Sequence, residues 1–219
     1  MEQELDFLTR HPVDLYLDVG ANTGQTGARL RQAGYGGRIV SFEPIAACFA
    51  QLAEKAAQDP QWEAHRTALG AEEGQARIGV SRNLVSSSLL EATEELIGIH
   101  EPIRYERHEE VPHARLDRIL PRIAGPGETV HLKIDTQGYE RFVIEGAAGV
   151  LDRIASVRME VAVRQIYRGE MTFAEAIGMM RDRDYVLVGL WPAWAHPGTG
   201  EILQFDLLFR RSPARPDPA

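Results

Sequence analysis

The sequence is poor in cysteine and contains no long hydrophobic run. Its one cysteine, Cys48, cannot form a disulfide within the chain or build a cysteine-based zinc site, which fits a reducing compartment best. No run approaches the roughly 18 apolar residues of a membrane span, and the first residues lack the basic start and apolar core of a secretory signal. We therefore expect a cytoplasmic protein without a membrane partner.

Positive charge is also scarce, since Lys+Arg number 24 against 32 for Asp+Glu and the formal net charge is −8. Neutralising phosphates needs a basic surface, which argues against a nucleic-acid partner. Only two of the basic residues are lysines, Lys55 and Lys133, so we expect each lysine to have a role beyond general solubility. The 44% hydrophobic and 26% charged residues are those of an ordinary globular protein, and 219 residues favour one domain.

Short runs rich in β-branched residues predict strands at 13–19, 38–42, 63–69, 130–134, 157–163, 185–190 and 202–209. Apolar residues at helical spacing predict helices at 24–33, 45–57, 140–151 and 172–182. This alternation implies right-handed crossovers and a mainly parallel sheet. Residues 191–200 contain Pro and Gly but no helical pattern, so the last two strands should form an antiparallel hairpin at the sheet edge.

The alternation breaks between Gly74 and His113, where a short strand at 76–81 is followed by an irregular, charge-rich segment. Long irregular segments in compact domains are usually functional or mobile, so we expect an insertion at about 74–113 that forms a lid over the site. The expected organisation is a single domain, 1–210, followed by a disordered proline-rich tail, 211–219.

The strongest local signal is the sequence DVGANTG at 18–24, where the first strand turns into a helix. Glycines there allow a close approach of the backbone to a ligand, although a strand-to-helix turn alone could require them. The GxxxG spacing lacks both the dinucleotide fingerprint and the Gly-Lys-Ser/Thr loop, so no bound phosphate is indicated. Asp18, just before the glycines, suits a ligand with an ammonium or sulfonium charge.

Glu43 ends the second strand, 19 residues after Gly24, and is followed by Pro44. A carboxylate at this edge of the sheet can accept hydrogen bonds from both hydroxyls of a ribose, whereas a solvated loop acid is the alternative. Together with the glycine loop, Glu43 favours a ligand that contains a nucleoside.

The fourth and fifth strands carry polar residues where apolar ones are usual. His131, Lys133 and Asp135 alternate along one strand and share a face, which is costly to bury unless they are paired or used. Lys133 could simply form an ion pair with Asp135 or a glutamate, but Asp135 lies at the strand's carboxyl end, where open α/β sheets bind ligands. Glu160, inside the apolar strand 157–163, should be either functional or paired with Lys133.

Several segments, in this order, resemble the FkbM family of S-adenosylmethionine-dependent methyltransferases. They are DVGANTGQ at 18–25, IVSFEP at 39–44, SSSLL at 86–90, LDRIL at 116–120, LKIDTQGYE at 132–140, EGA at 145–147 and QFDLLF at 204–209. FEP together with DTQGYE is specific to the family, whereas the glycine loop is shared by methyltransferases at large. The resemblance spans roughly 14–210, nearly the whole chain.

The resemblance implies an α/β, Rossmann-like class I methyltransferase fold, with a seven-stranded, mostly parallel sheet in the order 3-2-1-4-5-7-6. Strand 7 is antiparallel and helices cover both faces. The implied methyl donor is S-adenosyl-L-methionine, and the reaction is O-methylation of a hydroxyl on a sugar or natural-product scaffold. The expected partner is a small-molecule acceptor, such as a sugar or polyketide-like alcohol, with a homodimer left open. An N-methyltransferase of the same fold, or a cofactor-binding protein without turnover, is the alternative.

The resemblance also implies roles for single residues. Carried over by position, the residues at the methionine end of the cofactor are Asp18, Gly20, Asn22 and Gly24. Glu43 would hold the ribose, and the residues near the adenine would be Pro44, Ile45, Ala68 and Leu69. Asp135 would sit beside the methyl group and act as a base or orient the acceptor, with Glu160 as the next candidate and Lys133 tuning both.

Two further features leave alternatives open. Some O-methyltransferases use Mg²⁺, and Asp135, Glu160 and Asp206 could hold one, but the histidines show no paired metal spacing and Mg²⁺ is not favoured. Trp191 and Trp194 could form a surface that stacks against a sugar, or they could cap the sheet.

Overall fold

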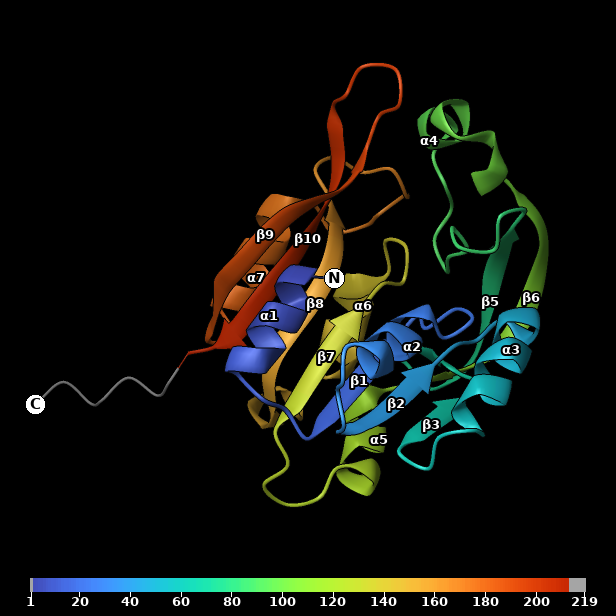
Figure 1. The fold of residues 1–219 in the computed structure, drawn as a ribbon. Coiled ribbons are helices and arrows are strands. Elements are labelled where there is room, and N and C mark those ends of the chain that lie inside the picture. The colour runs from blue at the N-terminus through green and yellow to red at the C-terminus, as the bar shows by residue number, and fades with distance from the viewer. Residues whose placement is uncertain (1, 213–219) are drawn as a thin grey trace, which may run out of the picture.

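A seven-stranded sheet lies at the centre of the computed structural model, which describes residues 2–212 (Figure 1). Its strands are β1 (Leu15–Val19), β2 (Arg38–Phe42), β3 (Trp62–His65), β7 (Val130–Ile134), β8 (Ile154–Ala162), β9 (Tyr185–Ala195) and β10 (Ile202–Arg211). They lie in the order β3-β2-β1-β7-β8-β10-β9; β10 is antiparallel to both neighbours and the other pairs are parallel. Counted along the chain within this sheet, the order is 3-2-1-4-5-7-6, so the predicted fold class is confirmed.

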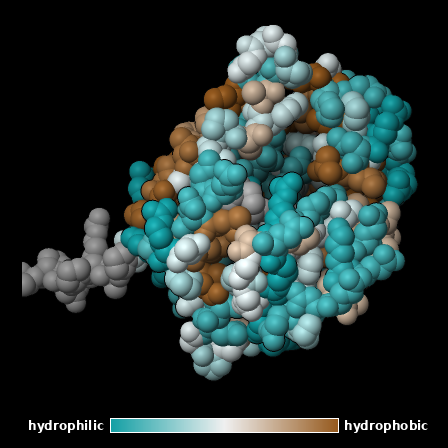
Figure 2. Space-filling model, viewed as in Figure 1, coloured by the Kyte–Doolittle hydropathy of each residue, from teal (hydrophilic) through white to brown (hydrophobic). Residues whose placement is uncertain are grey.

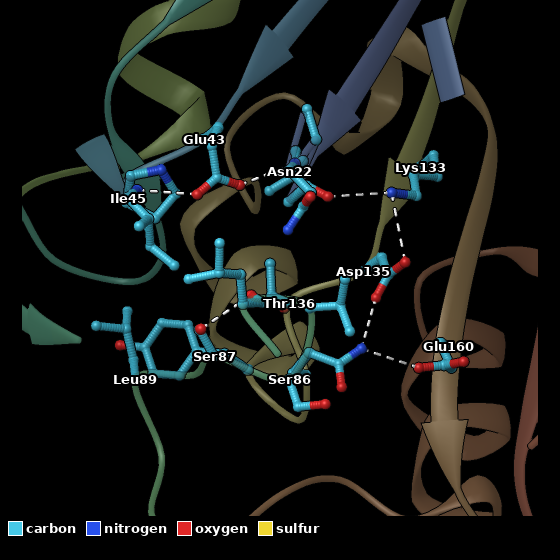
Figure 3. A pocket seen from close by; sticks show the side chains of 18 of the residues that line it. Asn22, Glu43, Ile45, Ser86, Ser87, Leu89, Lys133, Asp135, Thr136 and Glu160 are labelled. Carbon is cyan, nitrogen blue, oxygen red and sulfur yellow. Dashed lines mark hydrogen bonds and ion pairs between the residues drawn. The ribbon is translucent and has the colours of Figure 1, made fainter. Parts of the chain in front are cut away.

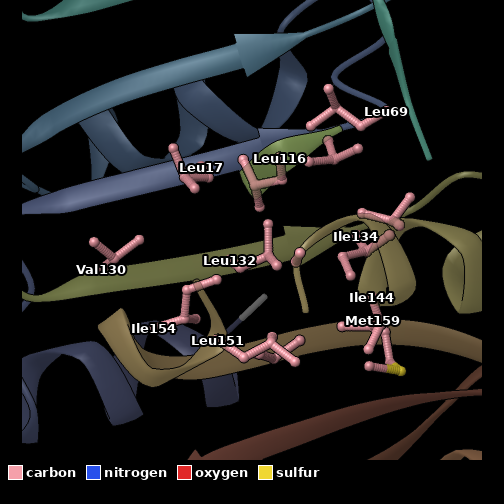
Figure 4. Packing of buried hydrophobic residues seen from close by; sticks show 14 of the residues in the cluster. Leu17, Leu69, Leu116, Val130, Leu132, Ile134, Ile144, Leu151, Ile154 and Met159 are labelled. Atoms are coloured by element: carbon pink, nitrogen blue, oxygen red, sulfur yellow. The ribbon is translucent and has the colours of Figure 1, made fainter. Parts of the chain in front are cut away.

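Helices cover both faces of this sheet (Figure 1). One face packs against α1 (Glu2–Arg10), α2 (Gln25–Gln32) and α3 (Ala46–Ala56). The other face packs against α5 (Leu116–Ile123), α6 (Glu140–Gly146) and α7 (Phe173–Arg181), and the larger hydrophobic core lies there (Figure 4).

Alternation along the central strands decides which side chains enter this core. In β7, Val130, Leu132 and Ile134 belong to it, and all five residues of the strand are buried. Because successive side chains point to opposite faces, His131 and Lys133 are buried on the side of α1. These two polar side chains must therefore find partners within the protein.

A second, three-stranded sheet lies beside the first, with β4 (Ala68–Leu69), β5 (Gly74–Ser81) and β6 (Tyr105–Ala114) in the order β4-β6-β5. The chain between β5 and β6 contains α4 (Glu94–Ile99) and a 3-10 helix, η1 (Glu101–Ile103). Figure 1 shows α4 across from the β9–β10 hairpin. The predicted insertion at 74–113 is thus mostly ordered secondary structure.

Two strand predictions are wrong in this region. The run 63–69 does not form one strand, because β3 ends at His65 and residues 68–69 pair with β6 in the other sheet. The segment expected to be irregular contains the ten-residue strand β6. Its backbone pairs with β5 while its charged side chains stay largely in solvent, so the charge run does not prevent strand formation.

The remaining differences concern helices that were not predicted and the ends of predicted elements. Helices α1 and α5 lie outside the predicted helices, and the predicted helix 140–151 ends at Gly146, followed by a short 3-10 helix, η2 (Leu151–Arg153). A side chain at Gly146 would collide with the carbonyl of Gly70, so the helix approaches β4 too closely for any other residue. Residues 191–195 extend β9 because they pair with β10, and Arg211 ends β10; the rest of the predicted tail, 213–219, lies outside the described residues.

Exposed large apolar side chains gather on the edge strand β9, as Figure 2 shows along that edge. They are Val186, Leu187, Val188 and Leu190, and no residue of β9 carries a formal charge. Elsewhere on the described surface such side chains occur singly, at Val85 and Val163. Across residues 2–212, no helix has the length and apolar character needed to cross a membrane.

A buried carboxylate anchors α1 to the sheet. Glu4 is fully buried and accepts hydrogen bonds from the Tyr16 hydroxyl at 2.6 Å and from Arg158 at 2.8 Å, and it lies 3.1 Å from Nε2 of His131. Burial alone would raise the pKa of Glu4, but the hydrogen bond with His131 and the charge of Arg158 lower it to about 2. His131 is therefore a partner in this network and does not line the cavity at the carboxyl ends of the strands.

Replacing Glu4 should destabilise the fold, because Glu4→Ala leaves the guanidinium of Arg158, whose side chain is only 13% exposed, with one carboxylate partner fewer. We expect Glu4→Ala to lower the free energy of unfolding by about 3–5 kcal/mol in urea titrations. The exposed residue Glu2 of the same helix is the control, and Glu2→Ala should cost less than about 0.5 kcal/mol. Equal effects of the two variants would contradict the anchoring role.

Candidate active site

A cavity of about 690 Å³ lies at the carboxyl ends of β1, β2, β7 and β8, covered by residues of the 74–113 segment (Figure 3). This volume is in the range of sites that hold small molecules. Among the residues predicted as catalytic or cofactor-binding, those that line the cavity are Gly20, Asn22, Glu43, Pro44, Ile45, Ala68, Leu69, Lys133, Asp135 and Glu160. Trp194 and Asp206, for which the sequence left alternatives open, line it too. Asp18 and Gly24 do not line the cavity, so the structure does not bring these two residues to the position predicted for them.

The glycine loop serves the approach of β1 to β7. Gly20 has φ 75°, and a Cβ atom there would lie 1.9 Å from the carbonyl oxygen of Asp135. Gly24 has φ 81° and contacts Leu52 and Trp62, so it allows α2 to pack closely and does not face the cavity. Asn22 also has a positive φ, 49°, and its backbone N–H points at Glu43.

Glu43 is held at the end of β2 by backbone groups (Figure 3). Its Oε2 accepts from the N–H of Asn22 at 2.9 Å and its Oε1 from the N–H of Ile45 at 2.8 Å. Each carboxylate oxygen can accept a further hydrogen bond from a ligand. The side chain is nearly buried, and burial raises the pKa of Glu43 to about 7 in spite of these two donors.

Lys133 joins the glycine loop to Asp135. Its ammonium lies 2.9 Å from Oδ1 of Asp18, 3.6 Å from Oδ2 of Asp135 and 3.3 Å from the carbonyl oxygen of Gly20. Burial would lower the pKa of Lys133, but the charges of Asp18 and Asp135 outweigh it and raise the pKa. Asp18 is fully buried and is thus the counter-ion of Lys133, a role not predicted from the sequence.

Asp135 and Glu160 face the cavity from neighbouring strand ends (Figure 3). Nε2 of Gln137 donates to Oδ1 of Asp135 at 2.8 Å and to Oε2 of Glu160 at 3.2 Å, and Gln204 donates to the same Oε2 at 3.0 Å. Glu160 is therefore paired with two amides, and the suggested pairing with Lys133 is wrong. Burial, followed by the charges of Asp135 and Asp206, raises the pKa of Glu160 well above its usual range.

Asp135, Glu160 and Asp206 do not form the suggested Mg²⁺ site. Asp206 accepts two hydrogen bonds from Arg158 and one from Nε1 of Trp191, so its carboxylate is occupied. Over residues 2–212 there is no group of three or more His, Cys, Asp or Glu side chains placed to hold a metal ion. Trp191 thus packs against the sheet, whereas Trp194 lines the cavity.

The cavity-lining residues that were not predicted as site residues include Gln137, Tyr167 and Gln204. Gln137 lies within the DTQGYE motif, so the motif itself was the signal that could have found it. Tyr167 lies in the loop after β8 and Gln204 lies in β10. Only the fold brings Tyr167 to Gln137 and Gln204 to Glu160. The segment that covers the cavity is tied to the same place, because Oγ of Ser88 donates to the carbonyl of Gln137 at 2.7 Å.

A family model described as the methyltransferase FkbM domain matches residues 18–187, which includes the glycine loop, β7 and most of the cavity. The chain belongs to the FkbM methyltransferase family. The predicted site residues, from Asp18 to Glu160, therefore lie within the matched domain. No curated protein matches the chain.

Solved methyltransferase structures share the fold of this FkbM domain. Magnesium protoporphyrin IX methyltransferase from Synechocystis PCC 6803, with bound SAM, is 12% identical with a TM-score of 0.54, and the match covers 96% of this chain and 77% of that chain. An rRNA methylase from Streptococcus thermophilus is 9% identical (TM-score 0.52; 96% and 95% covered). A putative rRNA methylase from Clostridium thermocellum is 10% identical (TM-score 0.50; 97% and 95% covered). At these identities the similarity concerns the fold alone.

The ion pair of Asp18 and Lys133 should show strong coupling. Lys133→Met leaves a buried carboxylate without its cation, so we expect a loss of about 3–5 kcal/mol in the free energy of unfolding. Adding Asp18→Asn to that variant should recover part of the loss, because the unpaired charge is removed. The other lysine, Lys55, is exposed, and Lys55→Met should change stability by less than about 0.5 kcal/mol. Additive effects of the two substitutions in chemical denaturation would refute the pairing.

Proposed function

We propose that this FkbM domain is an S-adenosylmethionine-dependent O-methyltransferase that acts on a hydroxyl of a sugar or natural-product scaffold, such as a polyketide-like alcohol. The observation that carries the proposal is the division of one cavity between two kinds of group. Glu43 and the loop of Gly20 and Asn22 lie at one end, and Asp135 and Glu160 lie at the other. The first end suits a nucleoside and the second suits an acceptor.

The residues present fit S-adenosylmethionine. Glu43 keeps free lone pairs for the two ribose hydroxyls, and Ile45, Ala68 and Leu69 form an apolar wall beside it that suits an adenine ring. No Gly-Lys-Ser/Thr loop is present to hold a phosphate, and the carboxylate of Asp135 suits a ligand with a positive sulfonium. In support, the protoporphyrin methyltransferase of the same fold was crystallised with SAM.

When bound, S-adenosylmethionine would supply a methyl group carried on a positively charged sulfur. The sulfur would keep the electron pair of the C–S bond and leave as a neutral thioether. The acceptor oxygen forms the new C–O bond and loses its proton. Asp135 receives or orients that proton, since its side chain is 38% exposed toward the cavity and Lys133 and Gln137 hold its carboxylate in place. The protein's main contribution is to position the two reactants.

Binding of the demethylated product tests the cofactor end. In calorimetry we expect S-adenosylhomocysteine to bind, whereas NAD and ATP should not. Glu43→Ala should weaken the affinity by about 1–3 kcal/mol, because the ribose hydroxyls lose charge-assisted hydrogen bonds. The control is Glu54→Gln on the exposed side of α3. Tight binding of NAD, with no heat of binding for S-adenosylhomocysteine, would contradict the proposed function.

The same binding should depend on pH through Glu43. Its pKa of about 7 means that the free protein carries a protonated Glu43 at lower pH, whereas ribose hydroxyls donate best to the ionised form. The affinity for S-adenosylhomocysteine should therefore fall as pH drops below about 7, by at most tenfold per pH unit. Glu43→Gln should flatten this dependence between pH 5.5 and pH 8. A wild-type profile that is equally flat would show that Glu43 does not titrate with binding.

Replacing Asp135 separates three roles. If Asp135 takes or orients the acceptor proton, Asp135→Asn should lower turnover by roughly 10²–10⁴ while cofactor affinity changes much less. A purely structural Asp135 would show a lower melting temperature with normal activity per folded molecule. Loss of wild-type activity in EDTA, restored by Mg²⁺, would make it a metal ligand. Near-normal turnover in a well-folded variant would defeat the catalytic assignment.

A further inference from the structure

The side chain of Gln137 donates to both carboxyl groups of the acceptor end, Asp135 and Glu160, and therefore lies between them. Figure 3 labels these two acids. The proposed function uses only the contact of Gln137 with Asp135 and gives its contact with Glu160 no role. A role for Gln137 at the acceptor end rests on that function, because it concerns the same cavity.

The backbone of Gln137 is fixed in an uncommon conformation. Its φ is 57°, in the left-handed region that few residues other than Gly, Asn and Asp adopt. The turn around it is held by Glu140, whose Oε1 accepts from the N–H and the hydroxyl of Thr136 and from the N–H of Gly138. Such strain persists only where the surroundings enforce it, and it often occurs at functional sites.

The amide of Gln137 has one orientation that satisfies its partners. Nε2 donates to the two carboxyl groups, and Oε1 lies 3.3 Å from the hydroxyl of Tyr167, which donates to it. Flipping the amide would turn its oxygen toward two acidic groups. The amide therefore holds Asp135 and Glu160 together, although like charges would drive them apart.

Each carboxyl group keeps one oxygen for a ligand. The amides of Gln137 and Gln204 occupy Oε2 of Glu160, and within residues 2–212 no protein group bonds its Oε1. Gln137 occupies Oδ1 of Asp135, while Oδ2 faces Lys133 at the longer distance of 3.6 Å. Burial and the charge of Asp135 raise the pKa of Glu160, which favours its protonated form. Protonated Glu160 can donate a hydrogen bond to a ligand, while Oδ2 of Asp135 can accept one.

The cations near this end are already paired. Lys133 is held by Asp18 and Asp135, and Arg158 is held by Glu4 and Asp206. Within residues 2–212 the acceptor end thus presents acidic groups and no unpaired buried cation, and it would repel a phosphate or carboxylate. An uncharged acceptor fits it.

We propose that Gln137 is a positioning residue that holds Asp135 and Glu160 as a pair, and that this pair binds an uncharged acceptor through two neighbouring hydroxyl groups. Asp135 accepts the proton of the hydroxyl that becomes methylated. Glu160 hydrogen-bonds the adjacent hydroxyl and fixes the angle of attack. The pair thereby selects one hydroxyl of a polyol.

Methyl transfer to a designed panel tests the acceptor class. The panel contains uncharged glycosides and polyketide alcohols with vicinal hydroxyls, their monodeoxy analogues, the matching sugar phosphates and amino sugars. We expect transfer to vicinal diols, and at least a tenfold loss for monodeoxy and phosphorylated counterparts. Transfer to none of the diols, equal transfer to the monodeoxy compounds, or transfer to nitrogen alone overturns the acceptor class. The proposed function survives those results if S-adenosylhomocysteine still binds, and it fails if it does not.

Gln137→Met tests the positioning role with a side chain of similar length. We expect kcat/KM for the diol to fall by roughly 10²-fold with little change in S-adenosylhomocysteine affinity. The acidic limb of its pH profile should move to higher pH, because the paired carboxyl groups lose their shared donor and hold a proton more tightly. The control is Gln165→Met, an exposed glutamine outside the cavity lining. A loss of stability without a shifted pH profile would make Gln137 merely structural.

A measurement without any acceptor tests the same pairing. Removing the shared donor leaves the ionised form of Glu160 with one hydrogen bond fewer, so Gln137→Met should lower the melting temperature more at pH 8 than at pH 6. In the background of Glu160→Gln this difference between the two pH values should vanish. An equal loss at both pH values, in both backgrounds, overturns the positioning role.

Discussion

The contact between the carboxyl ends of β1 and β7 is the constraint on which the site depends. Asp18 and Lys133 are register partners on these adjacent strands, and their ion pair lies in the interior. Two positions later Gly20 passes so close to the carbonyl of Asp135 that no side chain is tolerated there. The cofactor end and the acceptor end of the cavity are therefore joined through Lys133, which contacts Asp18, Gly20 and Asp135 at once.

The ionic partners of the central strands extend this arrangement across the sheet. On the face covered by α1, Lys133 lies beside Arg158, whose charge is matched by Glu4 of the first helix and Asp206 of the antiparallel strand. Removing one partner from such a buried pair leaves an uncompensated charge, so each member constrains the others. As a result the cations beneath the cavity are occupied by the protein, and the carboxyl groups above them remain for ligands.

The sequence allowed prediction of the features that depend on local pattern. Alternation of apolar runs and helical spacing indicated the parallel sheet and its terminal hairpin, and the glycine loop, Glu43 and Asp135 were placed at strand ends that the fold brings to one cavity. Prediction failed where pairing is not local. Strand β6 is too charged to show a strand pattern, and the run 63–69 is shared between two sheets. Helix α1 is held by Glu4, whose partners lie 12, 127 and 154 residues away in the chain.

By itself the sequence determined the alternation of strands and helices in the seven-stranded sheet, the absence of a phosphate loop and the presence of acidic residues at the ends of β2 and β7, because these follow from residue types at neighbouring positions. Only the tertiary structure decided which acids face the cavity. Asp18 and Asp135 both contact Lys133, yet one is fully buried as a counter-ion and the other is open to the cavity. It also decided that two amides, and no cation, hold Glu160. Burial and through-space pairing fix these roles, and neither quantity is encoded by spacing along the chain.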